Sequence, residues 1–173
     1  MHRHDCTFDH ALESEQLQLV HEILILDAFL KKPLDYLRHD SITRAFIAEL
    51  LDVLGMEELG ALGIYPAVDQ QAPGWSFIQP ITTSHVSAHY FEKPGRLPHI
   101  RLDAYSCESV DYAQLVRLCD KHFVLDEWHA SFIIRELDNP SARRIIDLSG
   151  FGGRVLSERE MTAKANFTKR YGS

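Results

Sequence analysis

Short stretches in which apolar and polar residues alternate dominate the pattern along this chain. Alternation with a period of two is typical of β-strands that bury one face. We predict such strands over residues 17–29, 64–68, 76–81, 82–90, 99–105 and 127–137. Pro80 cannot donate to a central ladder, so we expect the third of these strands to be irregular near its end.

Two segments have apolar residues at helical spacing instead. The first follows a possible N-cap at Asp40 or Ser41 and ends at Gly55, a residue type that often terminates helices. The second follows Ser109 and ends near His122. Runs of strands combined with two helices predict an α+β fold, a two-layer sandwich with a mainly antiparallel sheet and the helices on one face.

The length of 173 residues suits a single domain. We expect a flexible N-terminal segment over residues 1–16, an α+β domain over 17–137 and a C-terminal extension over 138–173. In the extension, residues 150–153 predict a flexible joint, and Ser157 to Glu160 form a capping box that predicts a final short helix. The histidines and the cysteine of the N-terminal segment match no metal-ligand spacing, so we predict no metal site.

Composition narrows the function classes. The net charge of −7 and the isoelectric point near 5.8 give no electrostatic footprint for nucleic acid, and they favour a cationic small-molecule substrate. The apolar runs are too short to cross a membrane, and the N-terminus lacks the apolar core of a signal peptide. Three cysteines without a framework spacing suit a reducing compartment, so we expect a cytoplasmic protein.

One strand carries an unusual density of reactive side chains. Ser84, His85, Ser87 and His89 fall within a single stretch, with Val86, Ala88 and Tyr90 alternating between them. Strict alternation places Ser84 and His89 on opposite faces of the strand. For these two side chains to meet, a bulge or a tight bend must intervene near Thr83 and Ser84.

The flanking residues extend this pattern. Ser76 stands in Gly-x-Ser, and Cys107 ends the sequence Leu-Asp-x-Tyr-Ser-Cys. Together with Ser84-His85-x-Ser87-x-His89 and an apolar strand that ends in Asp27, this ordered set resembles the short bacterial and archaeal type of pyruvoyl-dependent S-adenosylmethionine decarboxylase. The resemblance covers roughly residues 20–135, about two-thirds of the chain.

The resemblance implies a chain that cuts itself between Thr83 and Ser84. Ser84 would become a pyruvoyl group, the cofactor that holds the substrate as a Schiff base. His89 would be the base for processing, and Ser76 would assist by hydrogen-bonding the rearranging peptide. Cys107 would donate a proton to the substrate carbon after CO₂ leaves, because a thiol is a general acid with a pKa near the working pH.

The resemblance also implies the substrate and the assembly. S-adenosylmethionine would be decarboxylated to supply spermidine and polyamine synthesis. Trp75 and Phe77 are candidates to stack on adenine, and Glu92 could hold a positive charge of the substrate. Because domains of this family usually pair, we expect a homodimer of processed two-chain protomers, with neither nucleic acid nor membrane as a partner.

Departures from the family pattern keep alternatives open. Thr83 stands where glutamate is usual, and Glu108 where glycine is usual. The chain could therefore be a pyruvoyl-dependent decarboxylase of another amino acid such as arginine or ornithine, or a non-catalytic homologue that binds a ligand or a partner subunit. A serine hydrolase using Ser84, His89 and Asp103 ranks last, because no Gly-x-Ser-x-Gly elbow surrounds the serine.

Overall fold

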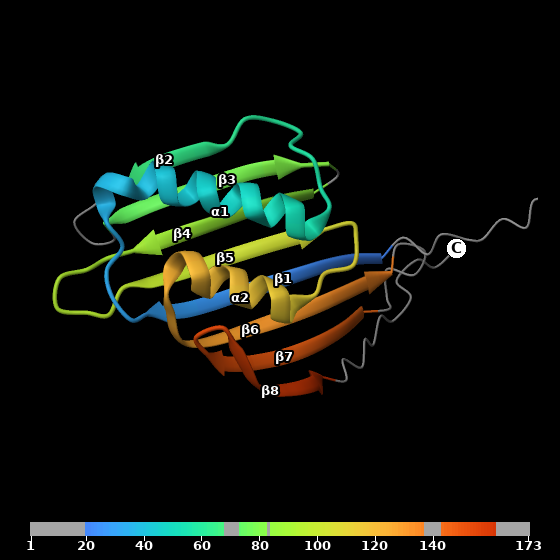
Figure 1. The fold of residues 1–173 in the computed structure, drawn as a ribbon. Coiled ribbons are helices and arrows are strands. Elements are labelled where there is room, and N and C mark those ends of the chain that lie inside the picture. The colour runs from blue at the N-terminus through green and yellow to red at the C-terminus, as the bar shows by residue number, and fades with distance from the viewer. Residues whose placement is uncertain (1–19, 68–72, 83, 137–142, 162–173) are drawn as a thin grey trace, which may run out of the picture.

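The computed structural model describes residues 20–67, 73–82, 84–136 and 143–161. These residues form eight strands, two α-helices and one short 3-10 helix (Figure 1). The strands are β1 (Val20–Leu30), β2 (Gly63–Ala67), β3 (Gly74–Ile81), β4 (Ser84–Phe91), β5 (His99–Ser106), β6 (Leu125–Glu136), β7 (Arg143–Phe151) and β8 (Arg154–Met161). The helices are α1 (His39–Leu54) and α2 (Tyr112–Phe123), and the 3-10 helix spans Tyr36–Arg38.

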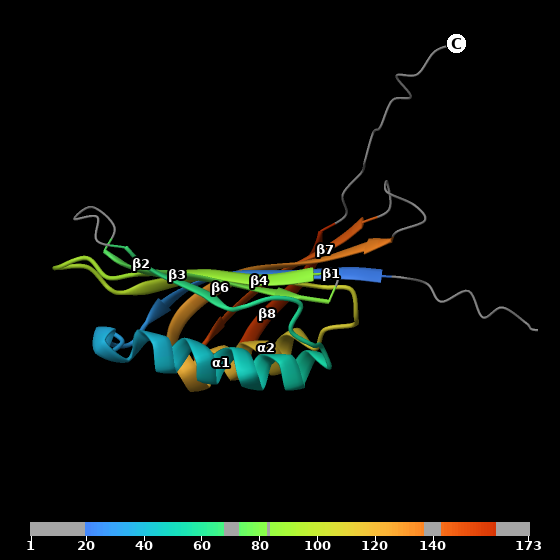
Figure 2. The same cartoon turned by 90° about the horizontal axis from the view of Figure 1, so that it is seen from above.

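All eight strands lie in one sheet. Their order is β2-β3-β4-β5-β1-β6-β7-β8, and every neighbouring pair is antiparallel. Both α-helices cover one face of the sheet, and no described element covers the other (Figure 2). This arrangement confirms the predicted α+β fold with helices on one face.

The core lies between the sheet and the helices, and alternation explains its composition. In the two central strands every second residue is buried toward the helices: Leu24, Leu26, Ala28 and Leu30 in β1, and Ile100, Leu102 and Ala104 in β5. The helices close the core with side chains at helical spacing, namely Phe46, Ile47 and Leu50 from α1 and Leu115, Val116, Cys119 and Phe123 from α2.

The uncovered face, called here the open face, carries the remaining residues of the same alternation. It is mixed in character, with His89, Arg101 and Asp27 in one cross-strand row. Large apolar side chains are exposed among these polar groups, including Ile25 and Phe29. An eight-stranded sheet with a partly apolar open face is an unusual surface for an isolated protein.

The C-terminal part differs most from the sequence prediction. Residues 154–161 form β8, so the helix predicted to begin at Ser157 is wrong as far as Met161. The joint predicted over 150–153 is a tight connection between β7 and β8. Gly150 lies directly against Trp128, and a Cβ there would be 2.2 Å from a ring carbon of the indole. The hairpin therefore packs as part of the sheet.

Smaller differences concern the ends of elements. Gly55 ends α1 in the left-handed conformation, as predicted, but α1 begins at His39 and has no side-chain cap. Asp111 caps α2 in place of Ser109, because its carboxylate accepts from the Gln114 N–H. Pro80 pairs with His85 without any shift of register, so the irregularity predicted there is absent. Among the described residues, the helices are too short or too polar to span a bilayer.

Candidate active site

Ser84 begins β4 at the closed end of the β3–β4 hairpin, where it pairs with Ile81. The neighbouring Thr82 is held by Glu57, whose carbonyl accepts from the Thr82 N–H at 3.1 Å. The Ser84 hydroxyl is buried and has no hydrogen-bond partner among the described residues. Burying a hydroxyl without a hydrogen-bond partner costs free energy of folding, so such a group is a candidate for a chemical role.

Cys107 lies at the same end of the sheet. It directly follows β5, and its Sγ is 3.7 Å from the carbonyl oxygen of Thr82. β4 and β5 are in register from His85 and Tyr105 onward, so Ser84 lies one residue beyond the last pair of this ladder. The structure thus places the predicted pyruvoyl precursor and the predicted proton donor at the same end of the sheet.

Ser76 and His89 form a second group. They pair directly across β3 and β4, and the Ser76 hydroxyl and the His89 Nδ1 are 2.6 Å apart in a hydrogen bond. Both side chains lie on the open face. His89 is five residues from Ser84 along a regular strand, a separation of about 16 Å. The structure therefore unites the two predicted processing residues but separates them from the serine on which they would act.

The separation has a geometric cause. β4 pairs with β3 over all of its length without a register shift, so no bulge occurs in β4. Ser84 and His89 remain on opposite faces, as strict alternation requires. β4 itself thus contains no bulge, whereas Thr83, at which a bulge or a tight bend was predicted and which is the other half of the predicted cleavage site, lies outside the described residues.

Three further ring side chains form a cluster across β4, β5 and β1 at the end of the sheet where β4 begins, and no role was predicted for them. Tyr105 on β5 hydrogen-bonds through its hydroxyl to Nδ1 of His21 on β1. The Tyr105 ring also meets the ring of His85 edge-on, at 5.7 Å between centroids. Only the position of Tyr105 two residues before Cys107 could have pointed to this cluster from the sequence.

The predicted substrate-binding residues lie elsewhere. Trp75 and Phe77 are 1% and 3% exposed within the core, so neither is accessible for stacking on a ligand. Trp75 instead donates its indole N–H to Thr43 Oγ1. Glu92 is half-buried and accepts the hydroxyl of Tyr90, and burial raises the pKa of Tyr90. Of these three residues, Glu92 alone remains open to solvent.

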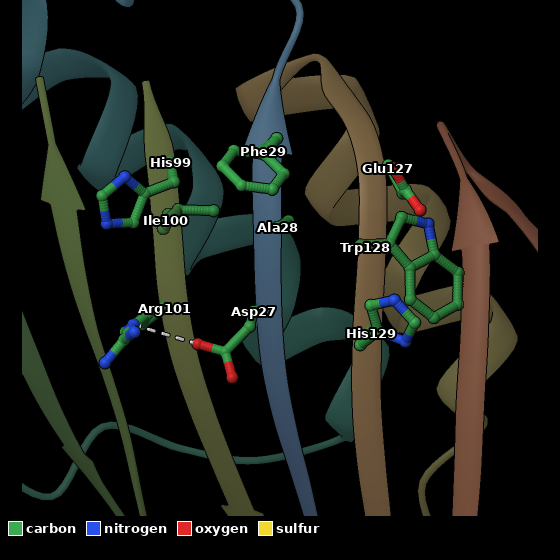
Figure 3. Close-up of a pocket in the computed structure, with 9 residues that line it drawn as sticks. All are labelled: Asp27, Ala28, Phe29, His99, Ile100, Arg101, Glu127, Trp128 and His129. Carbon is green, nitrogen blue, oxygen red and sulfur yellow. Dashed lines mark ion pairs between the residues drawn. The ribbon is translucent and has the colours of Figure 1, made fainter. Parts of the chain in front are cut away.

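A cavity of about 540 Å³ opens on the open face across β5, β1 and β6 (Figure 3). Asp27 on β1 forms an ion pair at 3.1 Å with Arg101 on β5, and His129 on β6 pairs with Asp27 from the other side. Phe29 and His99 close its far end. Because Arg101 pairs with His89 and Asp27 pairs with Arg101, the cavity continues the row that begins at Ser76 and His89.

The described cysteines have contrasting environments. Cys119 is fully buried in α2, and burial raises the pKa of its thiol to about 12. Such a thiol is a packing group rather than an acid or nucleophile near neutral pH. Cys107 is partly exposed. No group of three or more metal-binding side chains occurs among the residues that the structure describes.

Comparison with known proteins places this fold and site in a family. The family model for S-adenosylmethionine decarboxylase matches residues 23–136, more than half of the chain. The match includes Ser76, Ser84, His89 and Cys107, and it ends where β7 and β8 begin to extend the sheet. A search of curated proteins finds no match. Because the family model covers most of the two-layer α+β fold, the chain belongs to the S-adenosylmethionine decarboxylase family.

Proposed function

We propose that this protein is a self-processing, pyruvoyl-dependent decarboxylase, with S-adenosylmethionine as substrate and polyamine synthesis in the cytoplasm as its role. The observation that carries the proposal is the environment of Ser84. Its hydroxyl is buried without a partner among the described residues, and Cys107 lies within 3.7 Å of the preceding Thr82 carbonyl. Family membership supplies the chemistry that this arrangement would serve.

Processing would convert a serine into a ketone. The Ser84 hydroxyl oxygen would attack the Thr83 carbonyl carbon, so that a C–O bond forms, the C–N bond breaks and the amide becomes an ester. Removal of the Ser84 Cα proton would then expel the Thr83 carboxylate and leave dehydroalanine. Water would hydrolyse this residue to the pyruvoyl group and ammonia. A neutral imidazole such as that of His89 suits the proton abstraction.

The residues at the end of β4 and β5 fit such a group. A serine hydroxyl that makes no hydrogen bond among the described residues is available for acyl transfer, and no charged side chain of the described residues bonds to it. When bound in the chain, a pyruvoyl group supplies an electron sink for the carbanion left by CO₂. Cys107 would deliver the proton to the substrate carbon, since its thiol lies at the same end of the sheet.

The distance between His89 and Ser84 supports a proposal in which processing takes two copies of the chain. An imidazole about 16 Å along the strand cannot reach the serine of its own chain. His89 and Ser76 lie on the open face, which a second copy could cover. We propose a homodimer in which the Ser76–His89 pair of one copy serves Ser84 of the other, which it would reach around the hairpin end where Ser84 begins β4 rather than through the sheet.

Denaturing electrophoresis and mass spectrometry of the purified protein test self-processing. We expect two chains, 1–83 and 84–173, with a carbonyl at the start of the second chain that reacts with hydroxylamine. Ser84→Ala is expected to give one intact chain. An intact wild-type chain would leave the family's non-catalytic alternative, a protein that binds a ligand or partner subunit.

Coexpression of two inactive variants tests the division between copies. His89→Ala retains the serine but lacks the base, whereas Ser84→Ala retains the base. Each variant alone is expected to stay intact. In mixed dimers the His89→Ala chain should be cut, because its partner provides the imidazole. A His89→Ala chain that stays intact in the mixed dimers would contradict the two-copy arrangement.

Release of labelled CO₂ identifies the substrate. We expect release from S-adenosylmethionine, and release from arginine or ornithine alone would instead establish the alternative amino-acid decarboxylase. A serine hydrolase is disfavoured, because no described side chain hydrogen-bonds to the Ser84 hydroxyl and Asp103 pairs across from Ser87 rather than near it.

A further inference from the structure

The helix-facing side of β1 and β5 changes character at its last position before Cys107. At every helix-facing position of the two strands that lies farther from Cys107, the residue is apolar and buried. The next two positions are Glu22 and Ser106, which pair directly with each other in the sheet. They are 8% and 1% exposed. An apolar residue would be the default at both positions, because burying a carboxylate is costly unless its oxygens are hydrogen-bonded.

Both buried side chains bond to the loop that follows Cys107 and leads into α2. A Glu22 carboxylate oxygen accepts the Val110 N–H at 2.6 Å. The Ser106 hydroxyl accepts the Glu108 N–H at 3.0 Å. The backbone is thus held at Glu108, one residue after Cys107, and at Val110, three residues after Cys107. The β1–β5 ladder holds it at Ser106, just before Cys107. Hydrogen bonds to a charged acceptor are the stronger kind, so Glu22 is the main anchor.

We propose that Glu22 and Ser106 are positioning residues for Cys107. They hold the loop so that the thiol stays within reach of the Thr82 carbonyl and of the group made from Ser84. The proposal rests on the proposed function, in which Cys107 delivers the proton. Neither residue touches the reacting atoms, and both act through the backbone of the loop. A shift of the thiol by about 1 Å is enough to lower a rate about 100-fold.

Two substitutions at Glu22 separate its roles. Glu22→Gln keeps an oxygen that can accept the Val110 N–H, and it should retain kcat within about threefold. Glu22→Leu leaves that N–H without an acceptor, and kcat should fall about 10- to 100-fold with KM nearly unchanged. Thr43→Val is the matched control, because it removes another buried hydrogen bond, that of Trp75, far from Cys107. Its kcat should equal that of the wild type.

A second readout does not depend on decarboxylation. The rate of alkylation of Cys107 by iodoacetamide is measured against pH in the Ser84→Ala chain, with peptide mass spectrometry to separate Cys107 from Cys119. We expect Glu22→Leu to change the rate or its pH midpoint, and Thr43→Val to leave both unchanged. Ser106→Ala removes only the weaker anchor, so it should act in the same direction with a smaller effect, and it replaces Glu22→Leu if that variant does not fold.

The outcomes are distinguishable. Wild-type kcat and wild-type Cys107 alkylation in Glu22→Leu, or in Ser106→Ala where it stands in, would overturn the positioning role. An equal loss of kcat in Thr43→Val would also overturn it, because general destabilisation would then explain the effect. If the wild type neither cuts itself nor releases CO₂, the proposed function fails, and the alkylation series still decides whether Glu22 positions the thiol.

Discussion

At the scale of single residues, burial distinguishes side chains that can take part in chemistry from side chains that only pack in the core. Cys107 and Cys119 are the same residue type. In the sequence, Cys119 stands at helical spacing with the apolar residues of its segment, whereas Cys107 stands at the family spacing. The structure places one beside the Thr82 carbonyl and the other wholly inside α2. Glu22 could not be found from the sequence, because a single acidic residue in an apolar strand usually faces solvent. Its burial depends on the loop that it holds.

Cys119 predicts a dependence of stability on pH. Its pKa is raised from 9.0 in a model thiol to about 12 in the fold, so only the unfolded chain ionises between these values. Stability from this group is complete below pH 9 and falls as pH rises above it, by about 1 kcal/mol at pH 10. Urea unfolding at pH 8 and pH 10 measures the loss. Cys119→Ala should lose less stability over the same interval, and an equal loss would contradict the assignment.

At the scale of elements, prediction succeeded where one face is buried. β4 and β5 alternate because the helices cover one side of each, and the alternation is visible in the sequence. In β1 the run Ile23–Leu26 is apolar throughout, so the sequence does not show which face is buried; the structure buries Leu24 and Leu26 and leaves Ile25 39% exposed. β8 was missed for the opposite reason. It lies at the edge of the sheet and nearly all of its side chains are exposed, so its sequence has no hydrophobic period. The Ser157–Glu160 capping box was therefore the pattern that decided the prediction for this segment, and it predicted a helix.

The close packing of β7 against β6 predicts a strict requirement at Gly150. Alanine there would place its Cβ 2.2 Å from Trp128 and 2.1 Å from the Arg154 carbonyl oxygen. Because neither the indole nor the backbone can move freely, we expect Gly150→Ala to destabilise the fold by about 1–3 kcal/mol or more. Urea unfolding followed by tryptophan fluorescence measures the effect. Gly60→Ala is the control, since its nearest contact would be an ordinary 3.6 Å from Pro80.

At the scale of the whole molecule, the open face governs association. The apolar side chains on it and the separation of His89 from Ser84 both favour a second copy over that face. The sequence predicted pairing only through family resemblance. Which face would pair could not be deduced from it, because that depends on both helices lying on the same side of the sheet.

A charge on the open face tests this association. Ile25, 39% exposed at the centre of that face, becomes charged in Ile25→Asp. We expect a monomer by sedimentation and loss of self-processing, because burying an unpaired carboxylate in an interface is costly. Leu37→Asp alters a residue that is 92% exposed on the 3-10 helix, and it should leave both properties unchanged. A dimer that persists in Ile25→Asp would show that association uses another surface.

The two outermost strands have a consequence for how far assembly can proceed. β2 carries Pro66, which offers no N–H to an incoming strand, and β8 presents Glu158, Arg159 and Glu160 to solvent. Neither margin is suited to lateral growth, so sheets should not join side by side into fibrils. Contact through the open face alone leads to a closed dimer, because that face is buried once two molecules meet.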